Sequence, residues 1–118
     1  MKVIIAGSRT ITNPVALDSA ISSAINILNI SITEVVCGMA KGADELGRQW
    51  AIKHNIPVTE FHAAWTRYGK SAGKIRNAQM AEYADVLIAL WDGQSRGTEH
   101  MINKAKERNL KVYIHRTY

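Results

Sequence analysis

The sequence has 118 residues, of which 47% are hydrophobic and 21% are charged, and these are the length and proportions of one ordinary globular domain. A single cysteine excludes a disulfide framework and a thiolate metal cluster, and no run approaches the roughly 20 apolar residues that span a bilayer. The net charge of +5 favours anionic partners but does not identify one. We therefore expect one cytoplasmic domain over residues 1–118, with no membrane contact, no metal and no cofactor.

Strand and helix patterns alternate along the chain. Short runs rich in β-branched residues are typical of buried strands, and apolar residues that recur every three or four positions predict helices. Asn13 followed by Pro14 is a typical helix start, and Thr98 is expected to cap the last helix. In chain order, the pattern predicts strand 2–7, helix 14–29, strand 33–38, helix 43–54, strand 56–61, helix 72–83, strand 85–91, helix 98–108 and strand 110–115.

This alternation of strands and helices predicts an α/β fold. The expected architecture is a Rossmann-like three-layer fold, with a five-stranded, mostly parallel sheet in the order 3-2-1-4-5 and helices on both faces. The first and fourth strands are then neighbours at the topological switch point. Ligands of open α/β sheets bind there, outside the carboxyl ends of the strands, so the loops after the strands are the place to expect a site.

Three loops that contain glycine follow predicted strands and offer groups that bind anions. Glycine allows a sharp turn, arginine can grip a phosphate with two hydrogen bonds, and free N–H groups at a helix start favour an anion. Each loop alone is equally well interpreted as a surface turn, whereas the three together indicate a phosphate-bearing ligand. The candidate ligand-binding residues are Gly7, Ser8 and Arg9 in the first loop, Gly38, Lys41, Gly42 and Asp44 in the second, and Asp92, Gly93, Ser95, Arg96, Gly97 and Thr98 in the third.

A basic segment leads into the third predicted helix. No acidic residue occurs in 61–81, and Arg76 and Asn77 on this helix are further candidate ligand-binding residues. Two interpretations of the aromatic residues remain open. Trp65 and Tyr68 stack on the base of a ligand, or Trp65 belongs to the core with Tyr68 as a lid over it.

The combination of these loops is more specific than any one of them. GSR at 7–9, VVCGMAKGAD at 35–44 and GKSAGKIRNAQMAEYADVLIALWDGQSRGTEHMI at 69–102 together resemble the SLOG superfamily, and most closely its small YspA-like members. The resemblance covers nearly the whole chain. It implies a Rossmann-like domain that binds a nucleotide or a nucleotide-derived ligand, and analogy with related proteins implies a homodimer or a higher homo-oligomer.

Within this superfamily, the LOG phosphoribohydrolases cleave the N-glycosidic bond of nucleoside 5′-monophosphates. Their two motifs are similar to RNAQM at 76–80 and to the turn WDGQSRGTEH at 91–100. The resemblance implies that Arg76 contacts the phosphate or stabilises the departing group. The glutamate of the family's turn is out of register here, so the catalytic carboxylate would have to come from Glu99, Asp92 or Asp44.

The DNA-processing protein DprA, which binds single-stranded DNA, is similar in other loops. Its GSR and its glycine-rich turn resemble 7–9 and 38–44. The net charge and the basic segment agree with a nucleic-acid partner. One Phe, four Tyr and three Trp are few for a platform on which bases stack.

Four hypotheses therefore stand: a sensor or binding module for a nucleotide-like ligand, an N-glycosidic hydrolase, a binder of single-stranded nucleic acid, and a structural domain with ordinary turns. We favour the first because it accounts for both the anion-binding loops and the displaced glutamate. His100 is interpreted as an ordinary helix residue, with acid–base chemistry as the alternative.

Overall fold

The computed structural model describes residues 1–38 and 42–117 and contains a five-stranded parallel sheet. The strand order β3-β2-β1-β4-β5 confirms the predicted topology, and every pair of neighbouring strands is parallel. The central strand β1 pairs with β4 from Val3↔Val86 to Gly7↔Leu90, so the loops after these two strands begin side by side. The strands are β1 (Lys2–Gly7), β2 (Glu34–Cys37), β3 (Val58–Glu60), β4 (Val86–Trp91) and β5 (Lys111–Arg116).

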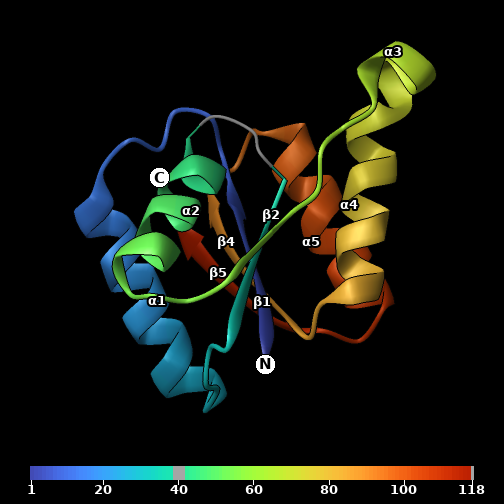
Figure 1. Cartoon of the computed structure of the whole chain (residues 1–118). Coiled ribbons are helices and arrows are strands. Elements are labelled where there is room, and N and C mark those ends of the chain that lie inside the picture. Colours follow the sequence, from blue (N-terminus) through green and yellow to red (C-terminus); the bar gives the residue numbers. More distant parts are fainter. Residues whose placement is uncertain (39–41, 118) are drawn as a thin grey trace.

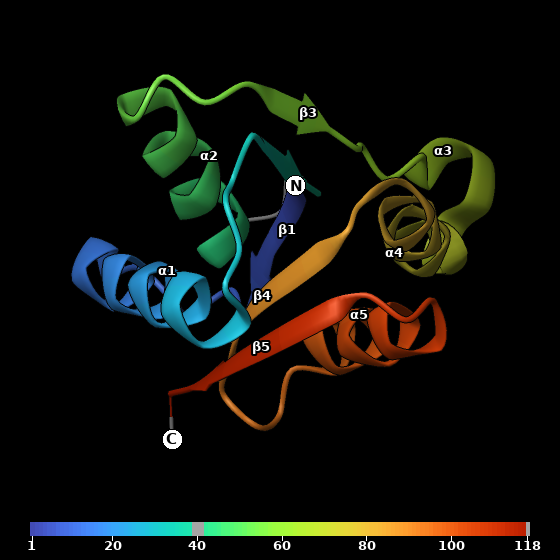
Figure 2. The same ribbon diagram turned by 90° about the horizontal axis from the view of Figure 1, so that it is seen from below.

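Helices cover both faces of the sheet, as Figure 2 shows in a view along it. On one face lie α1 (Pro14–Leu28) and α2 (Ala43–Lys53), and on the other lie α4 (Ala72–Tyr83) and α5 (Arg96–Glu107). Asn13 caps α1 as predicted, because its side chain accepts a hydrogen bond from the N–H of Val15 and Pro14 follows it.

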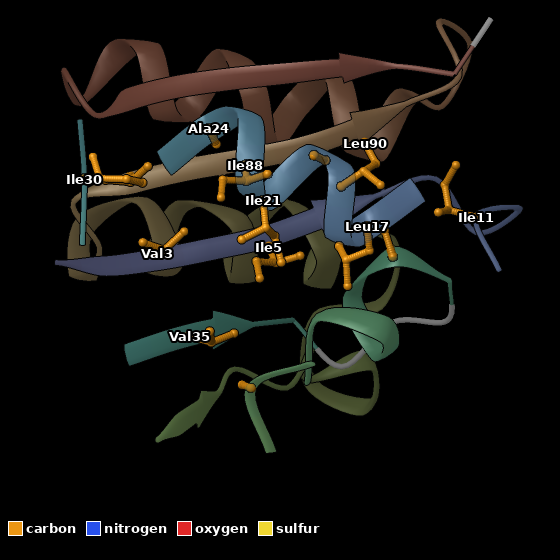
Figure 3. Close-up of a cluster of buried hydrophobic side chains, with 14 residues drawn as sticks. Val3, Ile5, Ile11, Leu17, Ile21, Ala24, Ile30, Val35, Ile88 and Leu90 are labelled. Carbon is orange, nitrogen blue, oxygen red and sulfur yellow. The ribbon is translucent and has the colours of Figure 1, made fainter. Parts of the chain in front are cut away.

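Two apolar clusters hold these layers together. The first lies under α1 and α2, where Leu17 and Ile21 of α1 pack on Ile5 of β1 and Ile88 of β4 (Figure 3). The second lies under α4 and α5 and includes the fully buried Met80. Because β4 is buried on both faces, its apolar residues do not alternate with polar ones, as expected of a central parallel strand.

The connection from β3 to α4 contains structure that the sequence pattern did not predict. It holds a short helix α3 (Trp65–Tyr68) and a 3₁₀ turn η1 (Gly69–Ser71), neither of which contains a buried residue. Figure 1 shows α3 at the end of α4, beyond the carboxyl ends of the strands and away from the layers of the fold. The interpretation of Trp65 as a core residue is therefore wrong, because the residue is 55% exposed.

The start of α5 also differs from the prediction. Thr98 was expected to be the cap, but the helix begins at Arg96 and its N-cap is Ser95, whose side chain accepts a hydrogen bond from the N–H of Thr98. Thr98 is instead buried in the first turn. The hydroxyls of Ser95 and Thr98 are in contact and three residues apart in sequence. Serine and threonine are both common N-cap residues, so the sequence pattern alone did not show which of the two is the cap.

None of the helices formed by the described residues is long and apolar enough to cross a membrane.

Candidate functional site

A cleft with a volume of about 620 Å³ lies at the carboxyl end of β1, between the loops after β1, β2 and β4 and the amino-terminal half of α4. This is the switch point at which the sequence analysis expected a ligand. Most of the predicted binding residues line it: Gly7, Arg9, Gly38, Asp44, Arg76, Asn77, Ser95, Arg96, Gly97 and Thr98.

Five predicted residues lie outside the lining of the cleft. Ser8 is buried behind it, Gly42 and Gly93 adopt backbone angles with φ near +80° in the supporting turns, and Glu99 is exposed. Asp92 lies in the loop that leads to α5. Lys41, which was also predicted to bind the ligand, lies outside the described residues.

The charge of the cleft is strongly positive. Among the described residues that line it, the only carboxylate is that of Asp44. Asp44 is 4% exposed, and its Oδ1 accepts a hydrogen bond of 3.3 Å from the N–H of Gly7, which joins α2 to the end of β1. The cationic residues of the lining are Arg9, Lys70, Lys74, Arg76 and Arg96. Lys70 and Lys74 belong to the basic segment 61–81 and were not among the predicted binding residues.

Arg76 is the least exposed of these five cations, and its guanidinium is only partly paired. Nη1 donates a hydrogen bond of 3.1 Å to the carbonyl of Gly38, and Nη2 donates one of 3.4 Å to Oδ1 of Asn77. The Nε–H is buried and has no acceptor among the described residues. A buried donor without an acceptor costs roughly 1–3 kcal/mol, so this placement of Arg76 is not the one that stability alone would favour.

Gly38 makes this placement possible. A Cβ on Gly38 would lie 2.9 Å from Nε of Arg76 and 3.0 Å from Oδ2 of Asp44. Both distances are shorter than ordinary van der Waals contact, so a side chain at position 38 would displace the guanidinium or the carboxylate. Glycine is therefore needed at position 38 because the side chains of Arg76 and Asp44 approach its backbone closely.

Asn77 links α4 to the start of α5. Its Nδ2 donates hydrogen bonds to the carbonyl of Gly97 at 3.3 Å and to Nδ1 of His100 at 3.1 Å, and its side chain is buried. Because Nδ1 of His100 accepts, the imidazole proton is on Nε2. Burial, followed by the positive charges of Lys104 and Lys74, lowers the pKa of His100 and favours this neutral form.

Asp92 shapes the loop after β4. Its Oδ1 accepts hydrogen bonds from the N–H groups of Gln94 at 2.8 Å and Ser95 at 2.7 Å, and its own N–H donates to Oγ of Ser8 at 3.1 Å. The bonds from the N–H groups of Ser95 and Gln94 hold the pKa of this carboxyl below its usual range. A carboxylate that stays ionised and is held by its own turn is poorly suited to transfer protons.

The floor of the cleft is apolar. Met80 of α4 and Met101 of α5, both fully buried in the second cluster, contribute to it together with Ala6 of β1. These residues belong to both the core and the cleft. A pocket with an apolar floor and a few polar groups around it is the usual form of a small-molecule site.

The cap of α5 sets the shape of the cleft mouth, which leads to a prediction. Replacing Ser95 with alanine is expected to lower the free energy of unfolding by about 1 kcal/mol, because the N–H of Thr98 loses its acceptor. The exposed neighbour Gln94 provides a control, since its replacement with alanine is expected to change stability by less than about 0.5 kcal/mol. Chemical denaturation of the three proteins measures both differences. Equal losses in the two variants would contradict the assignment of Ser95 as the cap.

No group of three or more His, Cys, Asp or Glu side chains within the described part of the chain could hold a metal ion.

Comparison with known proteins supports the geometry of the fold and identifies its family. The chain has the fold of DNA processing protein A (DprA) from Streptococcus pneumoniae, with a TM-score of 0.71 at 19% identity over 96% of this chain and 49% of that chain, so it spans about half the length of DprA. It is similar to the Gene 61 protein of Mycobacterium phage D29, at 33% identity over 117 residues, which cover 94% of this chain and 93% of that protein. Residues 1–68 match a model of the YspA, cpYpsA-related SLOG family. The chain belongs to the YspA, cpYpsA-related SLOG family.

Proposed function

We propose that the protein binds a nucleotide, or a nucleotide derivative that carries a phosphate, in the cleft at the carboxyl end of β1. The observation that carries this proposal is the composition of the cleft: among the described residues, five lysine and arginine side chains surround one buried carboxylate and an apolar floor. A nucleotide presents the matching groups, namely an anion, a sugar with hydroxyls and an apolar base. The volume of about 620 Å³ falls within the range of ligand sites, which is roughly 300–1,000 Å³.

The anion has several donors available at one end of the cleft. Arg76 lies there with donors that the protein does not use, and the first turn of α5 contributes Arg96 and Gly97. Backbone N–H groups at the start of a helix and the helix dipole favour a phosphate at such a place. Asp44, as the only carboxylate among the described lining residues, is suited to accept hydrogen bonds from sugar hydroxyls.

A single-stranded nucleic acid is the second candidate ligand. The observation that favours it is the arm formed by α3 and η1, on which Trp65 and Tyr68 are exposed beside Arg67 and Lys70. Exposed aromatic rings among cations are the usual means of binding unpaired bases. The fold shared with a DNA processing protein supports this candidate in general terms.

Titration of the protein with AMP, GMP, CMP, UMP, ADP-ribose and a short single-stranded DNA tests the proposal by calorimetry and thermal shift. We expect at least one nucleotide to bind and to raise the melting temperature, because it binds the folded state alone. The matching nucleoside without phosphate is the control, and we expect it to bind at least 10-fold more weakly, since a hydrogen-bonded charged group contributes about 1.5–3 kcal/mol.

The salt dependence separates the two candidates. Binding of a polynucleotide is expected to weaken steeply between 50 and 200 mM salt, because several phosphate contacts release counterions, whereas a mononucleotide in the cleft depends on salt far less. Binding of DNA alone, or equal binding of nucleoside and nucleotide, would contradict the proposal. Chromatography of the bound nucleotide completes the test. Release of free base would show that Asp44 or another group supplies a hydrolytic step.

A further inference from the structure

Trp65 presents a large aromatic side chain on the wall of the cleft while remaining 55% exposed. It belongs to the arm of α3 and η1, which has no buried residue and packs mainly on α4. Figure 1 shows this arm standing beyond the carboxyl ends of the strands, next to the end at which the cleft lies. The arm therefore adds no buried residue to the core, whereas Trp65 and Lys70 of the arm line the cleft.

The indole lies close to the first turn of α4. A Cβ on Gly73, in the first turn of α4, would lie 3.6 Å from Cη2 of Trp65, so the ring rests over this turn. Lys70 and Lys74 line the same part of the cleft. Within residues 1–38 and 42–117, the ring of Trp65 has no aromatic or cationic partner.

Tyr68 on the same arm provides a contrast. Its ring faces the guanidinium of Arg67 at 5.2 Å, and it lines an adjoining recess of about 230 Å³, which shares His62 and Arg76 with the cleft, but not the cleft itself. Tyr68 already has a cation over its ring, whereas Trp65 offers an unoccupied face to the cleft.

We propose that Trp65 is the base-stacking residue of the cleft, so that the ligand is a nucleotide whose base lies on the indole and whose phosphate reaches Arg76 and the first turn of α5. This inference rests on the proposed function. A planar base is the occupant that matches the surroundings, because the cations beside the ring favour a ligand that also carries an anion, and a base buries the exposed face of the indole. Stacking tolerates any base, since every base has a π face.

Affinities of the wild-type protein and three variants for two probes test the inference. The probes are the panel nucleotide that binds the wild-type protein most tightly and ribose 5-phosphate, which keeps the sugar and phosphate but has no base. We expect Trp65→Ala to weaken binding of the nucleotide by roughly 5- to 100-fold, and to leave binding of ribose 5-phosphate unchanged within about 2-fold. Trp65→Phe is expected to retain most of the affinity, because it keeps an aromatic face. Tyr68→Ala is the matched control and is expected to change neither affinity.

The outcomes distinguish the inference from the function on which it rests. If the wild-type protein binds none of the nucleotides, both proposals are wrong. If it binds a nucleotide but Trp65→Ala weakens both probes equally or neither, the cleft binds nucleotides without stacking on Trp65. Far-ultraviolet circular dichroism of each variant shows whether the fold is retained, and the exposure of Trp65 makes loss of the fold an unexpected result.

Discussion

Replacing Gly42 with alanine is expected to lower the free energy of unfolding by about 3–5 kcal/mol. Two separate costs contribute. Gly42 has φ of 83° and ψ of −127°, a backbone conformation that is nearly restricted to glycine and costs other residues roughly 1–3 kcal/mol. In addition, a Cβ there would lie 2.5 Å from the carbonyl oxygen of Ser8 and 2.7 Å from Cα of Arg9, and these are backbone atoms that cannot rotate away.

Gly69→Ala is a closely matched control for this prediction. Gly69 has φ of 57° and ψ of −130°, which is nearly the same conformation, but no atom lies within 4 Å of the position of its Cβ. An alanine at position 69 therefore meets only the cost of the unfavourable backbone conformation. We expect the free energy of unfolding to fall by about 1–2 kcal/mol at most, because the exposed arm can relax. Urea denaturation of both variants measures the difference. If the two variants are equally stable, the steric clash of a Cβ at position 42 with the loop after β1 does not contribute to the loss of stability.

The fold was more predictable than the site, because the signals for the fold are local in the sequence. The alternation of buried strands and amphipathic helices fixes a parallel sheet, and the strand order follows from the rules for its connections. The run of apolar residues in β4 marks a strand buried on both faces. These signals are local in the sequence and repeat in every element, so a few ambiguous positions do not change the result.

The site depends on contacts between distant residues, which the sequence does not display. The carbonyl of Gly38 meets the guanidinium of Arg76 across 38 positions, and Asn77 meets His100 across 23. Glycines and cations in the loops indicated the region in which the cleft lies, because these residue types suit loops that hold an anion. Which of them face the cleft, and which build its supporting turns as Asp92 does, depends on the arrangement of the loops and helices in space and not on the sequence pattern.

The arm of α3 and η1 could not be predicted from the sequence pattern. Its residues have no helical periodicity to detect, because a helix of four residues with no buried side chain has no apolar face. Trp65 was therefore open to two interpretations from the sequence, and only its exposure ruled out the core interpretation. A bulky aromatic residue outside the periodic pattern was the available signal.

Replacing Arg76 with methionine is expected to weaken binding of the panel nucleotide by about 10- to 100-fold without lowering stability. The loss of affinity corresponds to a charged hydrogen-bond donor that contributes roughly 1.5–3 kcal/mol to the bound phosphate. Stability is expected to be retained because removal of the buried, unpaired Nε–H offsets the loss of the two hydrogen bonds that the guanidinium donates to Gly38 and Asn77. Methionine keeps the apolar stem that packs in α4 and removes the buried Nε–H that has no acceptor among the described residues.

Two further variants show whether the charge or its position is responsible. Arg76→Lys keeps the charge but not the forked donors, and it is expected to recover only part of the affinity. Gly38→Ala keeps Arg76 itself and is expected to weaken binding about 10-fold or more, because its Cβ would lie 2.9 Å from Nε and displace the guanidinium. Lys106→Ala removes one positive charge from the exposed last turn of α5 and should change affinity by less than 2-fold at 150 mM salt.

Stability and affinity must be measured on the same variants, because their combination is what distinguishes a binding residue from a structural one. A residue selected for stability would lose stability when replaced by methionine and leave the affinity of the folded fraction unchanged. A residue held in the cleft for its ligand shows the opposite pattern. The buried Nε–H predicts the second pattern, since a ligand phosphate or a rearrangement on binding can supply the partner that the free protein lacks. Loss of stability with full affinity in Arg76→Met would remove this arginine from the site and leave the loops after β1 and β4 as the remaining phosphate contacts.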